Sequence, residues 1–152
     1  MERGREWASS VMRKHRLAER LLADVIGLDP AFIHEEACRW EHVISDRVEA
    51  RIAELLGNPT TSPYGNPIPG SGFVGPSPTP LDAFPASRAV IHSLSEQLQA
   101  NERVISALFA AGVRAGTTVE VEREGEGTVL RTPTGAVVLD AVDTRLVFVV
   151  PA

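Results

Sequence analysis

The chain has 152 residues, of which 43% are hydrophobic, enough apolar material for the core of one ordinary domain or of two small ones. Its formal net charge of -5 argues against a broad nucleic-acid-binding surface, because phosphate binding usually leaves a basic patch. No apolar run is long enough to cross a bilayer, and the polar start MERGREW lacks the apolar core of a signal peptide. These features favour a cytoplasmic protein that binds no membrane and, by itself, binds DNA poorly.

Helical spacing of apolar residues predicts that the first third of the chain is all helical. Gly27 supplies a stop for the first helix. Asp29 followed by Pro30 is a start signal for the second, because aspartate is a good N-cap and proline suits the first helical position. The three helices are expected at 5–26, from 30 through the segment 34–42, and from a cap at Ser45 or Asp46 through Leu56.

The composition changes abruptly after the third helix. Between Gly57 and Ser87 the only charged residue is Asp82, and eight of the eleven prolines lie there, which is typical of a linker or an extended docking segment. After Arg88 the apolar residues alternate with period two in short runs, which favours a small closed β-barrel. Strands are expected at 89–94, 117–122, 127–131, 136–139 and 145–150, with one short helix at 102–111.

The segment HEEACRWEH, residues 34–42, holds two of the chain's four histidines and its only cysteine. Successive helical residues rotate by about 100°. His34, Cys38, Glu41 and His42 are therefore expected to share one face of the second helix.

The first helix offers further ligands, because His15 and Glu19 are four residues apart and therefore adjacent on its surface. Thiolate, imidazole and carboxylate together suit a borderline divalent metal such as iron(II), cobalt, nickel or zinc better than Mg²⁺ or Ca²⁺. The alternative interpretation is a polar helix surface with Cys38 as a small buried hydrophobic residue.

Two enzymatic interpretations of the same segment are weaker. HEEAC is similar to the H-E-x-x-H motif of zinc hydrolases with the second histidine replaced by cysteine, and Glu35 would then be the general base. Cys38 could also be a nucleophile paired with His34 or His42, but nothing in the sequence orients the imidazole. We therefore do not expect an enzyme.

Three segments carry a resemblance to a known family: VMRKHRLAERLL at 11–22, HEEACRWEHVISD at 34–46 and SPYGNPIPG at 62–70. Together they resemble the metal-dependent repressors of the diphtheria toxin repressor and iron-dependent regulator family. AGVRAGTTVEV at 111–121 resembles the SH3-like domain that this family shares with ferrous-iron-transport A proteins. The resemblance implies an α+β chain with a helical metal-binding and dimerisation domain at 1–57, a Pro-rich linker or docking segment at 58–87 and an SH3-like β-barrel at 88–152.

The resemblance also divides the candidate ligands between two metal sites and an anion site. Cys38, Glu41 and His42 match the primary, activating site, where the carbonyl of Cys38 can also contribute, and His15, Glu19 and His34 match the ancillary site. Arg16, Ser62 and Asn66 match residues that hold an anion beside the ancillary metal. The manganese-responsive branch carries aspartate at the position of Cys38, so Fe²⁺ is expected here, with Co²⁺, Ni²⁺, Zn²⁺, Mn²⁺ or Cd²⁺ as substitutes.

The resemblance further implies a homodimer through the helical domain, with Trp40 and Phe32 either in that interface or in the chain's own core. Family members begin with a winged helix-turn-helix that this chain lacks, so DNA binding would need that missing domain, and with it a methionine ligand of the primary site. Asn101 and Val104 align with a glutamate and a glutamine that the SH3-like domain of relatives lends to the ancillary metal.

The function that we expect is the metal-sensing, dimerising regulatory core of an iron(II)-dependent DNA-binding transcriptional repressor, without its own DNA-binding domain. A first alternative is a stand-alone metal-binding or heterodimerising module that modulates full-length repressors. A second is a zinc hydrolase that uses Glu35. The spacing of Pro76 and Pro80 also suggests that the Pro-rich segment docks on its own SH3-like domain.

Overall fold

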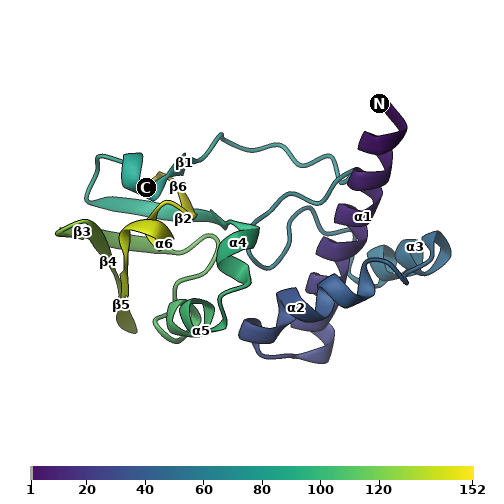
Figure 1. Cartoon of the computed structure of the whole chain (residues 1–152), viewed down its shortest axis with the longest axis horizontal. Helices are drawn as coiled ribbons and strands as arrows, with labels where there is room; N and C mark the ends of the chain where they lie inside the picture. Colours follow the sequence, from purple (N-terminus) through teal and green to yellow (C-terminus); the bar gives the residue numbers. More distant parts are fainter. Residues whose placement is uncertain (1) are drawn as a thin grey trace. The chain divides into compact units, whose positions relative to one another are not determined.

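The first helix ends at Gly27, as its sequence predicts. In the computed structural model, which describes residues 2–152, α1 spans Glu2–Leu21 and continues into a π-helical turn, Leu22–Ile26 (Figure 1). Gly27 has a φ of 75° and donates its N–H to the carbonyl of Leu22. A residue without a Cβ adopts this left-handed conformation at little cost, so Gly27 ends the helix.

Side-chain caps set the starts of the next two helices. α2 spans Pro30–Trp40, and the Asp29 carboxylate accepts a hydrogen bond of 2.9 Å from a backbone N–H of the first turn. α3 spans Asp46–Leu55, and Ser45 Oγ accepts a hydrogen bond of 3.2 Å from the N–H three residues later. Of the two caps predicted for α3, Ser45 takes the role.

The segment that follows α3 folds back onto the helices, and the unit they form together extends to Val74. Leu17, Ile52, Ala53 and Ile68 form a buried cluster that joins α1, α3 and this segment. Burial of these apolar side chains stabilises the unit. The boundary predicted at residue 57 therefore lies inside the helical unit.

Three arginines of α1 attach residues 58–70 to the helix. Arg13, Arg16 and Arg20 follow each other at helical spacing, and each donates hydrogen bonds to backbone carbonyls of this segment. The accepting carbonyls belong to Pro69, Pro67 and Thr61, respectively. Tyr64 is fully buried and donates from its hydroxyl to the carbonyl of Pro30, at 2.7 Å, which ties the segment to the start of α2.

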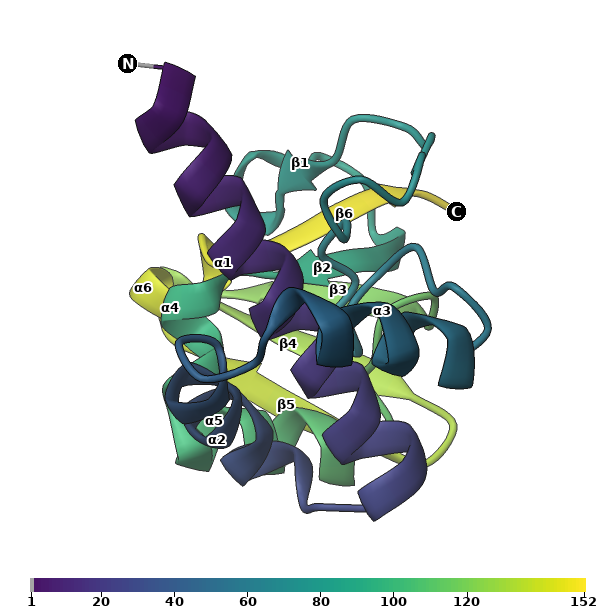
Figure 2. The ribbon, with the colours of Figure 1, turned by 90° about the vertical axis from the view of Figure 1, so that its right-hand side faces the viewer.

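Residues 75–152 form a second unit around an antiparallel sheet of six strands, in the order β1-β6-β2-β3-β4-β5. Figure 2 shows β2, β3 and β4 side by side in this sheet. The α+β class and the SH3-like sheet are as predicted. The strands are β1 (Thr79–Pro80), β2 (Arg88–Leu94), β3 (Thr118–Glu124), β4 (Gly127–Thr132), β5 (Gly135–Leu139) and β6 (Val147–Pro151). The helices are η2 (Leu81–Ala83), α4 (Glu96–Gln99), α5 (Glu102–Ala110) and α6 (Ala141–Thr144).

The end of the Pro-rich segment is part of the sheet. Thr79 and Pro80 pair with β6, and Leu81 is fully buried. The guanidinium of Arg123 donates to the carbonyls of Leu81 and Phe84. These contacts bind residues 79–84 to the β unit.

Buried and exposed residues alternate along β5, which allows a direct test of the register of this strand. Val137 is 5% exposed and Val138 is 70% exposed, because successive strand residues point to opposite faces. Val137→Ala should lower the free energy of unfolding by about 1–3 kcal/mol, and Val138→Ala by no more than about 0.5 kcal/mol. Chemical denaturation of both variants measures the difference. Equal losses would show that the register of β5 is different.

Among residues 2–152, no helix combines the length and the apolar character that a membrane crossing requires.

Candidate metal centre

The candidate ligands come from two helices and the turn after the second. His15 and Glu19 lie on α1, His34 and Cys38 lie on α2, and Glu41 follows the last residue of α2. On each helix the two residues are four apart and therefore adjacent. Contacts between α1 and α2 bring the pairs together. We call these five residues the His15 cluster.

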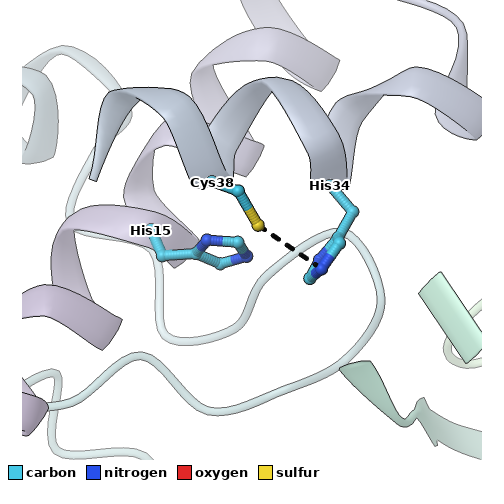
Figure 3. Close-up of side chains that lie close together, drawn as sticks. All are labelled: His15, His34 and Cys38. Carbon is cyan, nitrogen blue, oxygen red and sulfur yellow. Dashed lines mark hydrogen bonds between the residues drawn. The ribbon is translucent and has the colours of Figure 1, made fainter. Parts of the chain in front are cut away.

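Short contacts connect all members of the His15 cluster. His15 Nδ1 lies 2.6 Å from Glu41 Oε2, and His15 Nε2 lies 3.4 Å from Glu19 Oε1. His34 Nδ1 lies 3.7 Å from Glu19 Oε2, and its Nε2 lies 3.6 Å from Cys38 Sγ. The ligand atoms of His15, His34 and Cys38 all lie within 4.8 Å of one another, and their side chains converge in Figure 3.

Burial and charge act against each other at the centre of the cluster. Burial acts to lower the pKa of His15, but the hydrogen bonds and charges of Glu19 and Glu41 outweigh it and raise that pKa above its ordinary value of 6.5. Burial likewise acts to raise the pKa of Glu19, yet hydrogen bonds and charges of His15 and His34 hold that pKa below 4.5. The arrangement therefore favours a positive charge beside Glu19, which a proton or a metal ion can supply.

Two buried atoms of the cluster fit a metal ion. Among the described residues, His15 Nε2 and Glu19 Oε2 are buried without a hydrogen-bond partner. A buried polar atom without a partner is costly, and a bound cation would satisfy both atoms. Nitrogen, oxygen and sulfur donors together suit a transition metal. The cluster can thus hold such a metal.

The structure divides the residues predicted for the primary site. α2 ends at Trp40, and Glu41 is its C-cap in helical conformation, with its N–H donating to the carbonyl of Ala37; His42 lies in the turn that follows. The N–H groups of Val43 and Ile44 both donate to the carbonyl of Trp40, which ends the helix in a turn. His42 Nε2 lies 3.2 Å from Glu41 Oε1, and the His42 side chain is 59% exposed.

Of the residues predicted for an anion site, Ser62 and Asn66 lie in the segment after α3, and Arg16 of α1 contacts the same segment. Ser62 Oγ accepts hydrogen bonds of 3.2 Å from the N–H groups of Tyr64 and Asn66. Arg16 donates to the carbonyl of Pro67 in the same segment. The serine hydroxyl is buried and helps to form this turn.

In the β unit, the Asn101 side chain caps α5 by accepting a hydrogen bond of 3.2 Å from the N–H of Val104. Val104 itself is buried and apolar. These contacts give both residues a structural role in α5.

The contacts of Glu35 and His34 bear on the enzymatic alternatives. Glu35 is exposed and forms an ion pair of 3.0 Å with Arg39, so it points away from the cluster. The expectation that nothing orients the imidazole is wrong for His34, because Glu19 lies at its Nδ1. That orientation serves a metal ligand as well as a base.

Lys14 is a residue whose role the sequence analysis missed. It is buried next to His15, and its Nζ lies 2.6 Å from Asp46 Oδ1 and 3.1 Å from Glu49 Oε1. These ion pairs join α1 to α3. Lys14 lies three residues after Val11 and three before Leu17, on the apolar side of the predicted helix. A lysine at such a position indicates a buried ion pair.

Without metal, the free energy of unfolding of the helical unit should depend on pH through His15 and Glu19. The contribution of the raised pKa of His15 is complete below pH 6.5 and is lost as the pH rises through that pKa. The contribution of the lowered pKa of Glu19 is complete above pH 4.5 and is lost as the pH falls through that pKa. The two together stabilise the unit most between pH 4.5 and 6.5.

Urea unfolding of chelator-treated protein across this range measures the effect, with His15→Gln as the comparison. A variant whose pH profile equals that of the unchanged chain would contradict the assignment.

Comparison with known proteins places the cluster in a described domain. Residues 1–70 match the family model described as iron dependent repressor, metal binding and dimerisation domain. The chain is 47% identical over 148 residues to the diphtheria toxin repressor of Corynebacterium efficiens, which covers 89% of this chain and 63% of that protein. It is 48% identical over 140 residues to the iron-dependent repressor IdeR of Mycobacterium tuberculosis, which covers 84% of this chain and 61% of that protein.

Solved structures show the same arrangement of elements. A manganese-dependent transcriptional repressor in complex with manganese superposes with a TM-score of 0.85 at 27% identity, covering 100% of this chain and 74% of that one. The IdeR of T. acidophilum superposes with a TM-score of 0.80 at 24% identity, covering 100% and 71%, which shows a shared fold. The chain spans about three fifths of the length of the two curated relatives.

Proposed function

The chain belongs to the family of iron-dependent repressors, and we propose that it is the metal-sensing, dimerising regulatory core of an iron(II)-dependent DNA-binding transcriptional repressor. The observation that carries the proposal is the His15 cluster, in which two buried atoms, His15 Nε2 and Glu19 Oε2, lack a hydrogen-bond partner among the described residues. The cluster lies within the part of the chain that the family model matches. A metal ion bound there would connect α1 to α2.

Fe²⁺ is the physiological metal in this proposal. The thiolate of Cys38 beside two imidazoles favours a borderline metal over Mg²⁺, and the relatives at 47% and 48% identity are named for diphtheria toxin repression and iron dependence. Co²⁺, Ni²⁺, Zn²⁺, Mn²⁺ and Cd²⁺ are substitutes of similar charge. The metal would act as a cross-link between helices, with His15 and His34 as ligands from α1 and α2 and with Cys38, Glu19, Glu41 and His42 completing the two predicted sites.

Exposed apolar side chains support dimerisation through the helical unit. Exposed apolar side chains that lie next to one another mark interaction surfaces. The exposed members in this unit are Trp7, Val25, Ile26, Phe32, Val43, Val48, Leu55 and Val74. Phe32 therefore suits an interface better than the core of its own chain, and Trp40 is half-buried.

A chimaera tests the repressor function. The winged helix-turn-helix of the C. efficiens relative, joined ahead of this chain, should bind the relative's operator only when Fe²⁺ is present under anaerobic conditions. A second chimaera with His34→Gln should not respond to Fe²⁺. Operator binding that is the same with and without Fe²⁺ would contradict the proposal.

The exposed apolar residues also favour a second function, pairing with full-length relatives. Heterodimers with one DNA-binding domain would occupy the operator less well. Addition of this chain to a full-length relative, with operator occupancy followed by fluorescence anisotropy, should then lower occupancy. Unchanged occupancy at excess chain would leave only the first function.

Two finer expectations complete the proposal. A regulator of transcription in bacteria acts in the cytoplasm, where its DNA lies. The end of the Pro-rich segment docks on the SH3-like sheet, which the pairing of β1 with β6 supports. NMR shifts of a fragment 88–152 should move when a peptide 57–87 is added, and the absence of movement at high peptide excess would contradict docking.

A further inference from the structure

The contact between Cys38 and His34 crosses the division into two predicted sites. One predicted set contains His15 and His34, and the other contains Cys38. Nevertheless the ligand atoms of these three residues lie within 4.8 Å of one another, and Cys38 Sγ is 3.6 Å from His34 Nε2. With metal–sulfur and metal–nitrogen distances of about 2.3 and 2.0 Å, a tetrahedral ion holds its sulfur and nitrogen ligands about 3.5 Å apart. The separation of Cys38 Sγ and His34 Nε2 fits one shared ion, and His15 lies close enough to join it after a small movement.

Carboxylates orient both imidazoles toward this shared position. Glu41 Oε2 lies 2.6 Å from Nδ1 of His15, and Glu19 Oε2 lies 3.7 Å from Nδ1 of His34. Histidines that bind a metal commonly donate their other ring N–H to a carboxylate, which the contact with Glu41 allows for His15, while Glu19 lies beside His34 at ion-pair distance. This leaves Nε2 of each ring for a metal ion, with Nε2 of His34 3.6 Å from Cys38 Sγ and Nε2 of His15 3.4 Å from Glu19 Oε1.

The two rings also approach each other closely enough to serve one ion. Their centroids are 4.9 Å apart with an interplanar angle of 65°. Figure 3 shows the ring of His15 directed toward Cys38 and His34. His15 Nε2 is buried without a hydrogen-bond partner among the described residues, which a metal at this position would remedy.

We infer that His15, His34 and Cys38 form a mononuclear site that binds the first transition metal ion to enter the chain, through Nε2 of both imidazoles and the thiolate. This inference rests on the proposed metal-sensing function and adds the order in which its ligands act. Glu19 and Glu41 position the two rings. Three protein ligands would leave the fourth position of a tetrahedral ion to water.

A second ion changes the arrangement, because Cys38 cannot complete two separate sites with the same thiolate. In the two predicted sets Cys38 acts with Glu41 and His42, and Glu19 takes the place of Cys38 beside His15 and His34. His42 is exposed in the turn after α2 and is not a ligand of the first ion. Dependence on His42 should therefore appear only with the second ion.

Anaerobic titration of the full chain with Co²⁺ tests this order, because a thiolate bound to cobalt gives a charge-transfer absorption band. The band should reach most of its intensity at one equivalent and should be absent in Cys38→Ser. His15→Gln should weaken the binding of the first ion at least tenfold, and the same substitution at His42 should leave the first-equivalent band unchanged. A first-equivalent band that needs His42 and tolerates His15→Gln would overturn the inference, while leaving the two-site function intact.

Substitution of the buried His15 could disturb the fold, so far-UV circular dichroism of that variant is compared with that of the unchanged chain. A measurement on the unchanged chain tests the inference without any substitution. Zinc X-ray absorption at one equivalent should show one sulfur and two imidazole ligands. One sulfur with a single imidazole would overturn the inference. No binding of either metal would overturn both the inference and the proposed function.

Discussion

The Glu19→Gln variant should bind Co²⁺ about 10- to 100-fold more weakly than the unchanged chain. Glu19 is buried between the two imidazoles, 3.4 Å from Nε2 of His15 and 3.7 Å from Nδ1 of His34. Glutamine has the same shape but no charge, and its amide NH₂ cannot accept a hydrogen bond. Competition with a chelator of known affinity measures the loss.

Glu35→Gln is the matched control, because it makes the same change on the exposed face of α2. Glu35 forms its ion pair with Arg39 and lies away from the cluster. Its variant should keep the affinity of the unchanged chain. If both variants lose affinity equally, overall charge rather than the buried carboxylate controls binding.

The Leu17→Ala variant should lower the free energy of unfolding of the helical unit by about 2–5 kcal/mol. Leu17 is 1% exposed and belongs to the buried cluster with Ile52, Ala53 and Ile68. The shortened side chain removes apolar contacts and leaves a cavity between α1, α3 and the segment after α3. Because Leu17 lies between His15 and Glu19 on α1, metal affinity should fall as well. Urea unfolding with and without Co²⁺ measures both effects.

Leu55→Ala makes the same substitution on α3, at a side chain that is 66% exposed. Within one chain it should change the free energy of unfolding by no more than about 0.5 kcal/mol. If Leu55 contributes to the dimer, its effect will depend on protein concentration, whereas that of Leu17→Ala will persist at every concentration. Equal and concentration-independent losses would contradict the described core.

The elements could be predicted where their signals are local. Asp29, Ser45 and Gly27 act on hydrogen bonds within one turn of the backbone, so the sequence places the helix limits near them. Alternating apolar residues likewise predicted β2 to β6. The strand at Thr79–Pro80 could not be predicted this way, because its partner is β6, far away in the sequence.

For the site, the sequence by itself determined which donors are available: three imidazoles, two carboxylates and a thiolate on α1, on α2 and just after α2. Spacing relates residues of one helix only. Which donors of α1 meet which donors of α2 depends on how the two helices contact each other. Only the tertiary structure decided that Glu41 contacts His15 and that Glu19 lies between the imidazoles of His15 and His34. These contacts depend on how α1 and α2 pack against each other, and buried side chains far apart in the sequence determine that packing.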